Sequence, residues 1–274
     1  MSRRRFGRSM MTTVALVAAL ALCGCTLPGP LGHADPGPKV LFFDDFDGPA
    51  GAPPAAHWRY DVGGGGWGND ELQVYTDSPA NASLDGDGNL AIIARGEADQ
   101  RITSARLTTR GTMDFTYGRA EARIAVPAGA GLHPAFWLLG SNVDTVGWPQ
   151  SGEIDVIETL NDARNYHLGV HAPKPGSERG QEVSTSAVAP HPLAGEFRTY
   201  WVERSPGRIV MGIDHLPLFT VTPAELASPA DWVFDAPFFL LLNLAVGGSW
   251  PGPPDASTPN PSIMLVDWVK VTEL

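Results

Sequence analysis

The stretch Glu153-Ile154-Asp155-Val156-Ile157-Glu158 combines three carboxylates with three β-branched apolar side chains. The β-branched side chains indicate a strand, in which alternate residues point to opposite faces. Simple alternation puts Glu153 and Asp155 on one face and Glu158 on the other. One extra residue, a β-bulge between Asp155 and Glu158, would return Glu158 to the face of the other two acids. We therefore predict a bulged strand that buries Ile154 and one of the two bulge residues.

The crowding of these acids also points to function. Carboxylates that share a sheet face repel one another, so stability alone gives no reason to gather them. An exposed edge strand would also carry acids, but such a strand usually mixes in Lys or Thr and needs no bulge. Perturbed acids gather where chemistry requires them. We predict that Glu153, Asp155 and Glu158 are catalytic.

Short apolar or alternating segments, separated by turns, fill the rest of the chain. The 274 residues include 31 Gly and 25 Pro, and no long stretch has the 3.6-residue apolar period of a helix. Residues 222–227 are expected to form one or two helical turns. The further candidate strands are residues 40–43, 89–95, 101–109, 118–126, 134–139, 166–171, 198–203, 208–213, 238–246 and 264–272. This pattern predicts an all-β sandwich.

Residues 1–34 are expected to be an export signal, because a basic start is followed by a short apolar run. The Arg3-Arg4 pair fits either a twin-arginine signal or an ordinary basic leader. Two endings stay open: a lipoprotein signal that lipidates Cys25, or cleavage after Ala34 to release the enzyme. Both Cys residues lie in this segment, so no disulfide is expected beyond it. Residues 35–39 are expected to be a short tether, and residues 40–274 a single domain.

Several motifs, taken together, resemble those of bacterial glycoside hydrolase family 16 enzymes of the laminarinase type. The resemblance covers nearly all of residues 40–274. Besides the acidic strand, it rests on the segments Gly66-Trp67-Gly68-Asn69-Asp70-Glu71-Leu72-Gln73, Tyr117-Gly118-Arg119-Ala120-Glu121-Ala122-Arg123, Pro134-Ala135-Phe136-Trp137-Leu138-Leu139-Gly140 and Leu242-Asn243-Leu244-Ala245-Val246-Gly247-Gly248. The chain departs from the family at His133, where Trp is more usual, and at Asp70, where Asn is more usual.

The resemblance implies a jelly-roll sandwich whose concave sheet forms an open carbohydrate-binding cleft. It also implies a retaining endo-acting hydrolase that cleaves β-1,3-linked, or mixed β-1,3/1,4-linked, glucan by double displacement. In this pattern Glu153 is similar to the nucleophile, Asp155 to its helper and Glu158 to the acid/base. Retention needs two carboxyl groups about 5–5.5 Å apart. Four strand steps separate Glu153 from Glu158 by ~13 Å of backbone, which long side chains on a curved strand can bridge.

Seven further residues are candidate substrate-binding residues: Asn69, Arg106, Trp137, Trp148, His171, Asn243 and Trp250. Trp148 and Trp250 lie in Gly/Pro loops, where a large apolar side chain is expected to meet a ligand. A place in the core would explain Trp137 and His171 as well, and a turn or surface position would explain Asn69 and Arg106. Asn243 interrupts an apolar run without an obvious polar partner, which favours the cleft floor.

Expectations for metals are limited. Related enzymes imply a structural calcium at Asp267 with Gly88, although one carboxylate is a thin calcium signal and a lone surface Asp is the simpler interpretation. The histidines lack a metal-ligand motif such as His-Glu-x-x-His, so catalysis is expected to need no cofactor.

Partner expectations follow from charge and resemblance. The formal charge of −11 argues against nucleic acid, membrane contact is expected only through a lipid on Cys25, and a monomer is expected. A polysaccharide, β-glucan, is the expected substrate. Two alternatives stay open: a hydrolase or transglycosylase of another cell-surface polysaccharide such as a galactan, and a carbohydrate-binding protein on the same fold. The binding protein would not need all three acids.

Overall fold

The computed structural model describes residues 37–97 and 101–274. Contacts divide the chain into Met1–Gly37 and Pro38–Leu274, and the second unit contains all the strands that the structure describes. The predicted export signal, with Cys25, and residues 35 and 36 of the tether lie outside the described residues. Within them, no helix has the length and apolar character needed to cross a membrane.

The larger of the two sheets has ten strands within the described residues. In order across the sheet they are β15 (Leu216–Val221), β14 (Arg208–Ile213), β13 (Arg198–Ser205), β8 (Gly118–Ala125), β17 (Ser262–Thr272), β5 (Leu90–Gly96), β6 (Ile102–Ser104) and β3 (Gln73–Tyr75), with β1 (Val40–Asp44) paired to β17 and β4 (Ala82–Leu84) paired to β5. The pairing of β3 with β6 is parallel, whereas the other pairs in this sheet are antiparallel.

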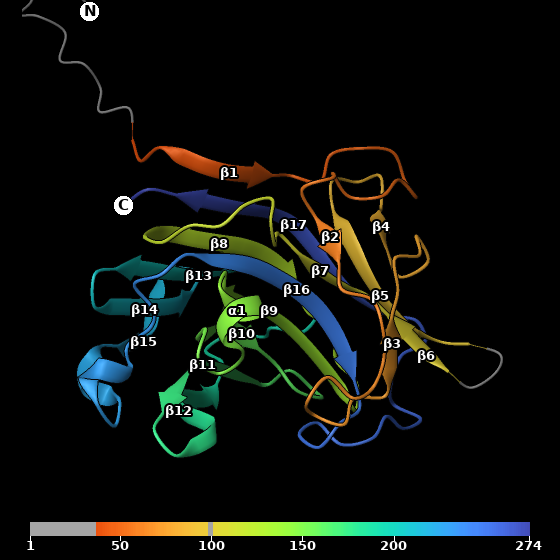
Figure 1. Cartoon of the computed structure of the whole chain (residues 1–274). Helices are drawn as coiled ribbons and strands as arrows, with labels where there is room; N and C mark the ends of the chain where they lie inside the picture. Colours follow the sequence, from red (N-terminus) through yellow and green to blue (C-terminus); the bar gives the residue numbers. More distant parts are fainter. Residues whose placement is uncertain (1–36, 98–100) are drawn as a thin grey trace, which may run out of the picture. The chain divides into compact units, whose positions relative to one another are not determined.

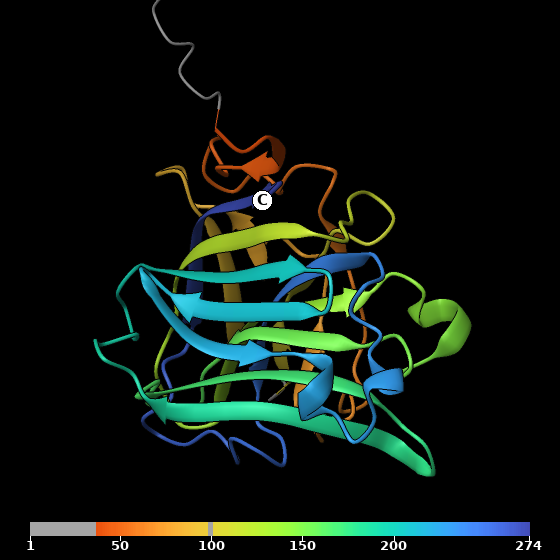
Figure 2. The same cartoon turned by 90° about the vertical axis from the view of Figure 1, so that its left-hand side faces the viewer.

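The second sheet, of seven described strands, is antiparallel throughout. Its order is β12 (Ser177–Val188), β11 (Asn165–Lys174), β10 (Glu153–Glu158), β9 (Leu132–Gly140), β16 (Phe238–Val246), β7 (Arg106–Thr108) and β2 (Arg59–Tyr60). In the part of the chain that the structure describes, three short helical elements lie between strands: α1 (Val143–Val146) and the 3-10 turns η1 (Pro223–Glu225) and η2 (Pro229–Asp231). Figure 1 shows the strands of the two sheets as layers, and Figure 2 shows them turned by 90°.

Apolar side chains from both sheets meet in one core. Ile124 of β8 and Val266 of β17 come from the ten-stranded sheet, and Phe136 of β9 and Leu242 of β16 from the seven-stranded sheet; all four are fully buried. Burying this apolar surface holds the layers together. The predicted all-β sandwich is therefore confirmed.

The structure corrects two details of the predicted strands. The segment 101–109 is two strands, β6 and β7, because the chain passes from one sheet to the other at the buried Ala105. Five of the described strands were not predicted from the sequence: β2, β3, β4, β12 and β15. The longest of them, β12, has mostly polar and exposed residues, since it lies at the edge of its sheet. The helical turn expected at 222–227 is η1, capped by Thr222 and Glu225.

The predicted β-bulge in β10 is confirmed by the register against β9. Asp155 lies opposite Trp137 and Ile157 opposite Phe136, so Val156 is the extra residue. Both bulge residues pack in the core, with Val156 0% and Ile157 1% exposed. The prediction that one of them would be buried was wrong, because the bulge turns two consecutive side chains inward.

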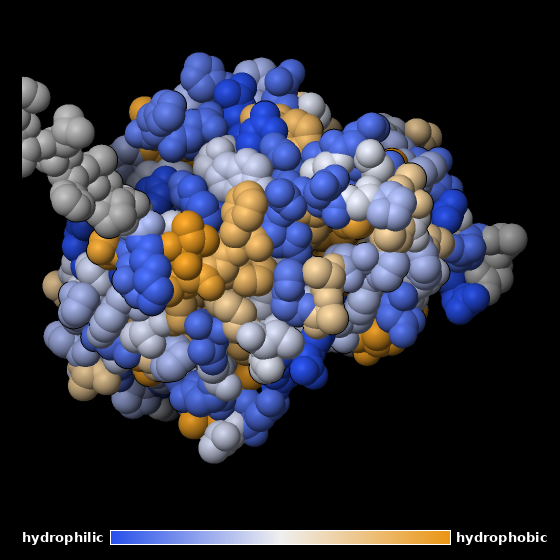
Figure 3. All heavy atoms as spheres, turned by 90° about the horizontal axis from the view of Figure 1, so that it is seen from above, coloured by the Kyte–Doolittle hydropathy of each residue, from blue (hydrophilic) through white to orange (hydrophobic). Residues whose placement is uncertain are grey.

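The first strand carries apolar side chains at the surface. Val40, Leu41 and Phe43 of β1 are exposed, whereas Phe42 packs against the core. Figure 3 shows the molecule from the β1 side of Figure 1, with apolar side chains gathered among mostly hydrophilic ones. These apolar residues lie on the ten-stranded sheet, which does not carry the acidic strand.

Candidate active site

The acids of β10 lie on the outer face of the seven-stranded sheet, which we call the site face. A row of opposed residues crosses four strands there: Glu158, Ala135 of β9, Asn243 of β16 and Arg106 of β7. Residues directly opposite one another point to the same side of a sheet. The fold thus brings together candidates that are more than a hundred residues apart in sequence.

Glu153 and Asp155 share one histidine on the neighbouring strand. His171 of β11 lies opposite Glu153, and its Nε2 is 3.4 Å from Asp155 Oδ2 and 3.8 Å from Glu153 Oε1. Asp155 is 4% exposed, and the other two are partly buried. His171 therefore lies beside the acids on the site face, and its alternative as an ordinary core histidine is wrong.

Burial and mutual repulsion make these acids hold protons unusually strongly. Burial, followed by the charge of Asp155, raises the pKa of Glu153 to about 8. Burial and the charge of Glu158 raise the pKa of Asp155 to about 6. Burial alone would lower the pKa of His171, but the hydrogen bond and charge of Asp155 and the charge of Glu153 raise it to about 9. At neutral pH an imidazolium thus lies against carboxyl groups that share a proton.

Glu158 has a different histidine partner, His133 of β9. The His133 Nε2 to Glu158 Oε1 distance is 2.8 Å, and His133 is 8% exposed. In the sequence His133 stands out only as a departure from the family pattern, and it was not predicted to lie in the site. Strand alternation carried a usable signal, because His133, Ala135 and Trp137 fall on one face of β9.

Trp137 and Asn243 are joined by a hydrogen bond on the site face. Trp137 Nε1 donates to Asn243 Oδ1 at 2.7 Å, and Asn243 Nδ2 donates to Tyr75 OH at 3.0 Å. The expectation that a buried Asn243 would lack a polar partner was wrong, because Tyr75 of β3 accepts a hydrogen bond from it. Tyr75 and the adjacent Glu71 are site residues that the sequence did not reveal. Burial raises the pKa of Glu71, while Gln73, His133 and Arg106 oppose this.

Arg106 is held between two aromatic rings. Its guanidinium carbon is 4.7 Å from the Trp67 ring centroid and 4.6 Å from that of Trp137, and its Nε pairs with Asp61 Oδ2 at 3.0 Å. Such cation–π contacts keep an arginine in one position. Asn69 lies in the loop beyond Trp67, and its backbone oxygen accepts from Ser249 N at 2.7 Å. This contact joins the loop that carries Asn69 to the loop that carries Trp250.

Trp148 and Trp250 flank the acidic strand. Trp148 is 43% exposed, and its ring centroid is 5.8 Å from that of His171, near Glu153. Trp250 is 45% exposed and lies edge-on to His133 at 5.3 Å, near Glu158. Exposed indole rings at both ends offer apolar faces on which a ligand can stack.

The candidate calcium residues have other neighbours. The carboxylate of Asp267 pairs with Arg123, and Gly88 lies in the turn that Asp85 holds between β4 and β5. The calcium assignment stays a prediction. Among the described residues, Glu153, Asp155 and His171 offer ligand atoms within 4.8 Å of one another, so this group could hold a cation when His171 is unprotonated.

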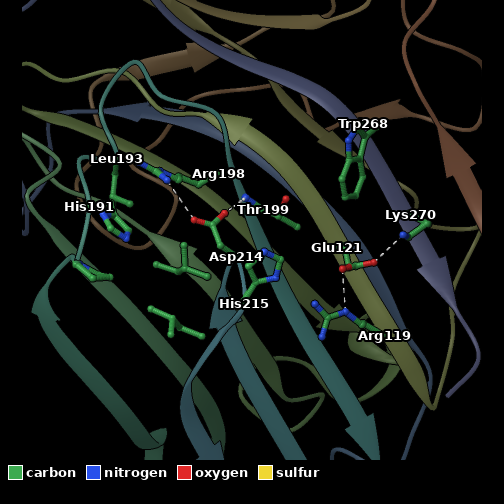
Figure 4. Close-up of a pocket in the computed structure, with 13 residues that line it drawn as sticks. Arg119, Glu121, His191, Leu193, Arg198, Thr199, Asp214, His215, Trp268 and Lys270 are labelled. Carbon is green, nitrogen blue, oxygen red and sulfur yellow. Dashed lines mark hydrogen bonds and ion pairs between the residues drawn. The ribbon is translucent and has the colours of Figure 1, made fainter. Parts of the chain in front are cut away.

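A separate depression of about 790 Å³ lies on the ten-stranded sheet. Figure 4 shows its wall, in which Glu121 pairs with Arg119 and Lys270, while Asp214 pairs with Arg198. Because both carboxylates are neutralised by cations, this depression lacks the crowded acids of the site face.

Comparison with known proteins places these features in context. Residues 67–270 match the family described as Glycosyl hydrolases family 16. A beta-glucanase of Rhodothermus marinus is 36% identical, covering 96% of this chain and 95% of that protein.

Solved structures agree with that match. The catalytic domain of an endo-1,3-beta-glucanase (laminarinase) from Thermotoga petrophila has a TM-score of 0.77 and 35% identity, covering 86% of this chain and 97% of its own. An endo-1,3-beta-glucanase from Streptomyces sioyaensis has a TM-score of 0.77 and 32% identity, covering 90% and 99%.

Proposed function

Because the chain belongs to glycosyl hydrolases family 16, with its jelly-roll fold, we propose that it cleaves β-1,3-linked, or mixed β-1,3/1,4-linked, glucan with retention of configuration. As an enzyme it is an endo-β-glucanase-like glycoside hydrolase. The observation that carries the proposal is the bulge, which gathers Glu153, Asp155 and Glu158 on the site face. Fold stability does not explain three acids on one face of a sheet, because carboxylates placed side by side repel one another.

The proposed reaction has two displacement steps. Glu153 attacks the anomeric carbon and forms a covalent glycosyl intermediate, while Glu158 donates its proton to the departing oxygen. Water then gives a proton to Glu158 and attacks the anomeric carbon, which releases Glu153. The first step needs Glu153 ionised and Glu158 protonated, and the charge of His171 beside Glu153 favours the ionised form of that carboxyl group.

The other residues of the site face fit a sugar chain. Trp148 and Trp250 present exposed rings near Glu153 and Glu158, and sugar rings stack on such faces. Arg106, held between Trp67 and Trp137, has N–H groups suited to sugar hydroxyls. Asn69 and Asn243 are proposed as further hydroxyl contacts.

Digestion of defined polysaccharides tests the proposal. We expect hydrolysis of laminarin and of a mixed-linkage β-glucan into oligosaccharides of several lengths, as an endo-acting enzyme produces. Proton NMR in the first minutes should show the β anomer, because two displacements restore the configuration.

Other outcomes would point to a different mechanism, substrate or function. Early release of the α anomer would contradict the nucleophile role of Glu153. Cleavage of a galactan alone would favour the alternative substrate, and saturable binding of glucan without cleavage would favour a carbohydrate-binding protein.

His171→Asn is expected to move the acidic limb of the kcat/KM profile to higher pH. The imidazolium lowers the pKa of Glu153 and of Asp155, so without it Glu153 ionises only at higher pH. We expect a shift of about one pH unit, the lower end of what a neighbouring opposite charge produces. His215→Asn, in the exposed turn after β14, is the matched control. An unmoved acidic limb would show that His171 does not tune these acids.

A further inference from the structure

His133 forms a hydrogen bond with one of the three acids of β10, Glu158. Its Nε2 is 2.8 Å from Glu158 Oε1, whereas His171, on the other side of β10, contacts Glu153 and Asp155. The Trp250 ring covers His133 edge-on, at 5.3 Å between centroids and an interplanar angle of 88°. Glu153 and Asp155 therefore share the imidazole of His171 on β11, whereas Glu158 contacts the imidazole of His133 on β9.

The second ring nitrogen of His133 restricts how that imidazole can be used. Nδ1 is buried and has no hydrogen-bond partner among the residues that the structure describes. Nε2 is thus the atom through which His133 interacts, and it can donate to Glu158 in the neutral Nε2–H form as well as in the imidazolium form.

Charged groups from three sides face His133. Glu158 and Asp155 come from β10, Glu71 from the loop before β3, and His167 from β11. Burial alone would lower the pKa of His133, but the hydrogen bond and charge of Glu158, with the charges of Glu71 and Asp155, raise it. A proton on Nε2 is therefore favoured, and the N–H points at Glu158 Oε1.

We propose that His133 is a positioning residue for Glu158, which holds Oε1 so that Oε2 faces the glycosidic oxygen. This inference rests on the proposed function. In the first step the O–H bond at Oε2 breaks as the departing oxygen takes the proton, and the new carboxylate is stabilised by the His133 N–H. In the second step Oε2 takes a proton from the attacking water, while Oε1 stays bound to His133.

Two variants separate the hydrogen bond from the shape of the side chain. His133→Phe keeps a ring beneath Trp250 but removes the donor, and His133→Gln places a neutral amide N–H near the position of Nε2. On laminarin we expect His133→Phe to lower kcat by about 10²-fold, the lower end of a general acid/base contribution. His133→Gln should recover most of that loss, with KM changing less than kcat in both variants.

An aryl substrate shows whether His133 works through the acid. A 2,4-dinitrophenyl β-laminaribioside has a leaving group that needs no proton, so its release bypasses the role of Glu158 as an acid. Here His133→Phe should slow the burst of dinitrophenolate by no more than about threefold, well under the effect of acid catalysis. His167→Phe, which removes the other imidazole at Trp250, is the matched control and should affect both substrates equally.

Circular dichroism and thermal melting should show that both His133 variants are folded. Equal losses on laminarin and the aryl substrate, or a His133→Gln variant as slow as His133→Phe, would each overturn the proposal.

A measurement without substrate separates this inference from the proposed function. In NMR titrations the pKa of His133 should fall when Glu158 is replaced by Gln, because the carboxylate that holds the proton has gone. An unchanged His133 pKa would overturn the pairing even in an active glucanase. If the pKa falls but the wild type cleaves no β-glucan, the pair stands, and both the proposed function and the catalytic use of the pair are wrong.

Discussion

Glu153→Ala is expected to lower the hydrolysis rate by roughly four to six orders of magnitude, as happens when one member of a catalytic unit is removed. Without this carboxylate no covalent intermediate can form, although Glu158 can still donate its proton. An α-glycosyl fluoride mimics that intermediate, so the same variant should transfer sugar from it. Laminarin hydrolysis and fluoride release measure the two activities.

The folded state of this variant should not be weakened. The pKa of Glu153 is raised to about 8 from its ordinary 4.5, so above pH 4.5 the carboxyl group opposes folding, and this penalty reaches its full size above pH 8. The melting temperature at pH 7 should therefore stay level or rise. Glu182→Ala, an exposed acid opposite His171, is the control and should keep activity within about threefold, as for most exposed substitutions. Near wild-type hydrolysis by Glu153→Ala would rule out the nucleophile assignment.

Inserting one apolar residue after Ile157 is expected to abolish activity by turning Glu158 into the core. Side chains alternate along a strand, so a one-residue change reverses the face of everything beyond it. A buried, unpaired carboxylate is strongly unfavourable, and Glu158 would also lose His133. We expect activity to fall at least ~10⁴-fold, the upper range for loss of a general acid/base, together with a lower melting temperature.

Deleting Ile157 is the matched comparison. The remaining Glu-Ile-Asp-Val-Glu puts all three acids on one face by alternation alone. Because Ile157 is 1% exposed, its loss should cost about 2–5 kcal/mol of stability, but the protein should fold and keep measurable glucanase activity. Activity in the insertion variant together with none in the deletion variant would refute the role of the bulge.

The sequence by itself determined the acidic strand, its bulge and the all-β architecture. These features depend on local rules: β-branched residues favour strands, and side chains alternate between faces. Three acids within six residues could be assigned to one face from spacing alone. The same local rules failed for β12, whose polar edge position removes the apolar pattern, and for 101–109, where the chain changes sheets.

Only the tertiary structure decided the surroundings of those acids. Tyr75 and Asn243 are 168 residues apart in sequence and share a hydrogen bond, and Arg106 meets Trp137 because β7 and β9 both pair with β16. Alternation along β9 puts His133 on the same face as Trp137, but it does not show that Glu158 lies next to it. Strand order across a sheet depends on which apolar faces pack together over the whole chain. Local spacing therefore identifies the acids, but not the residues that contact them and shift their pKa values.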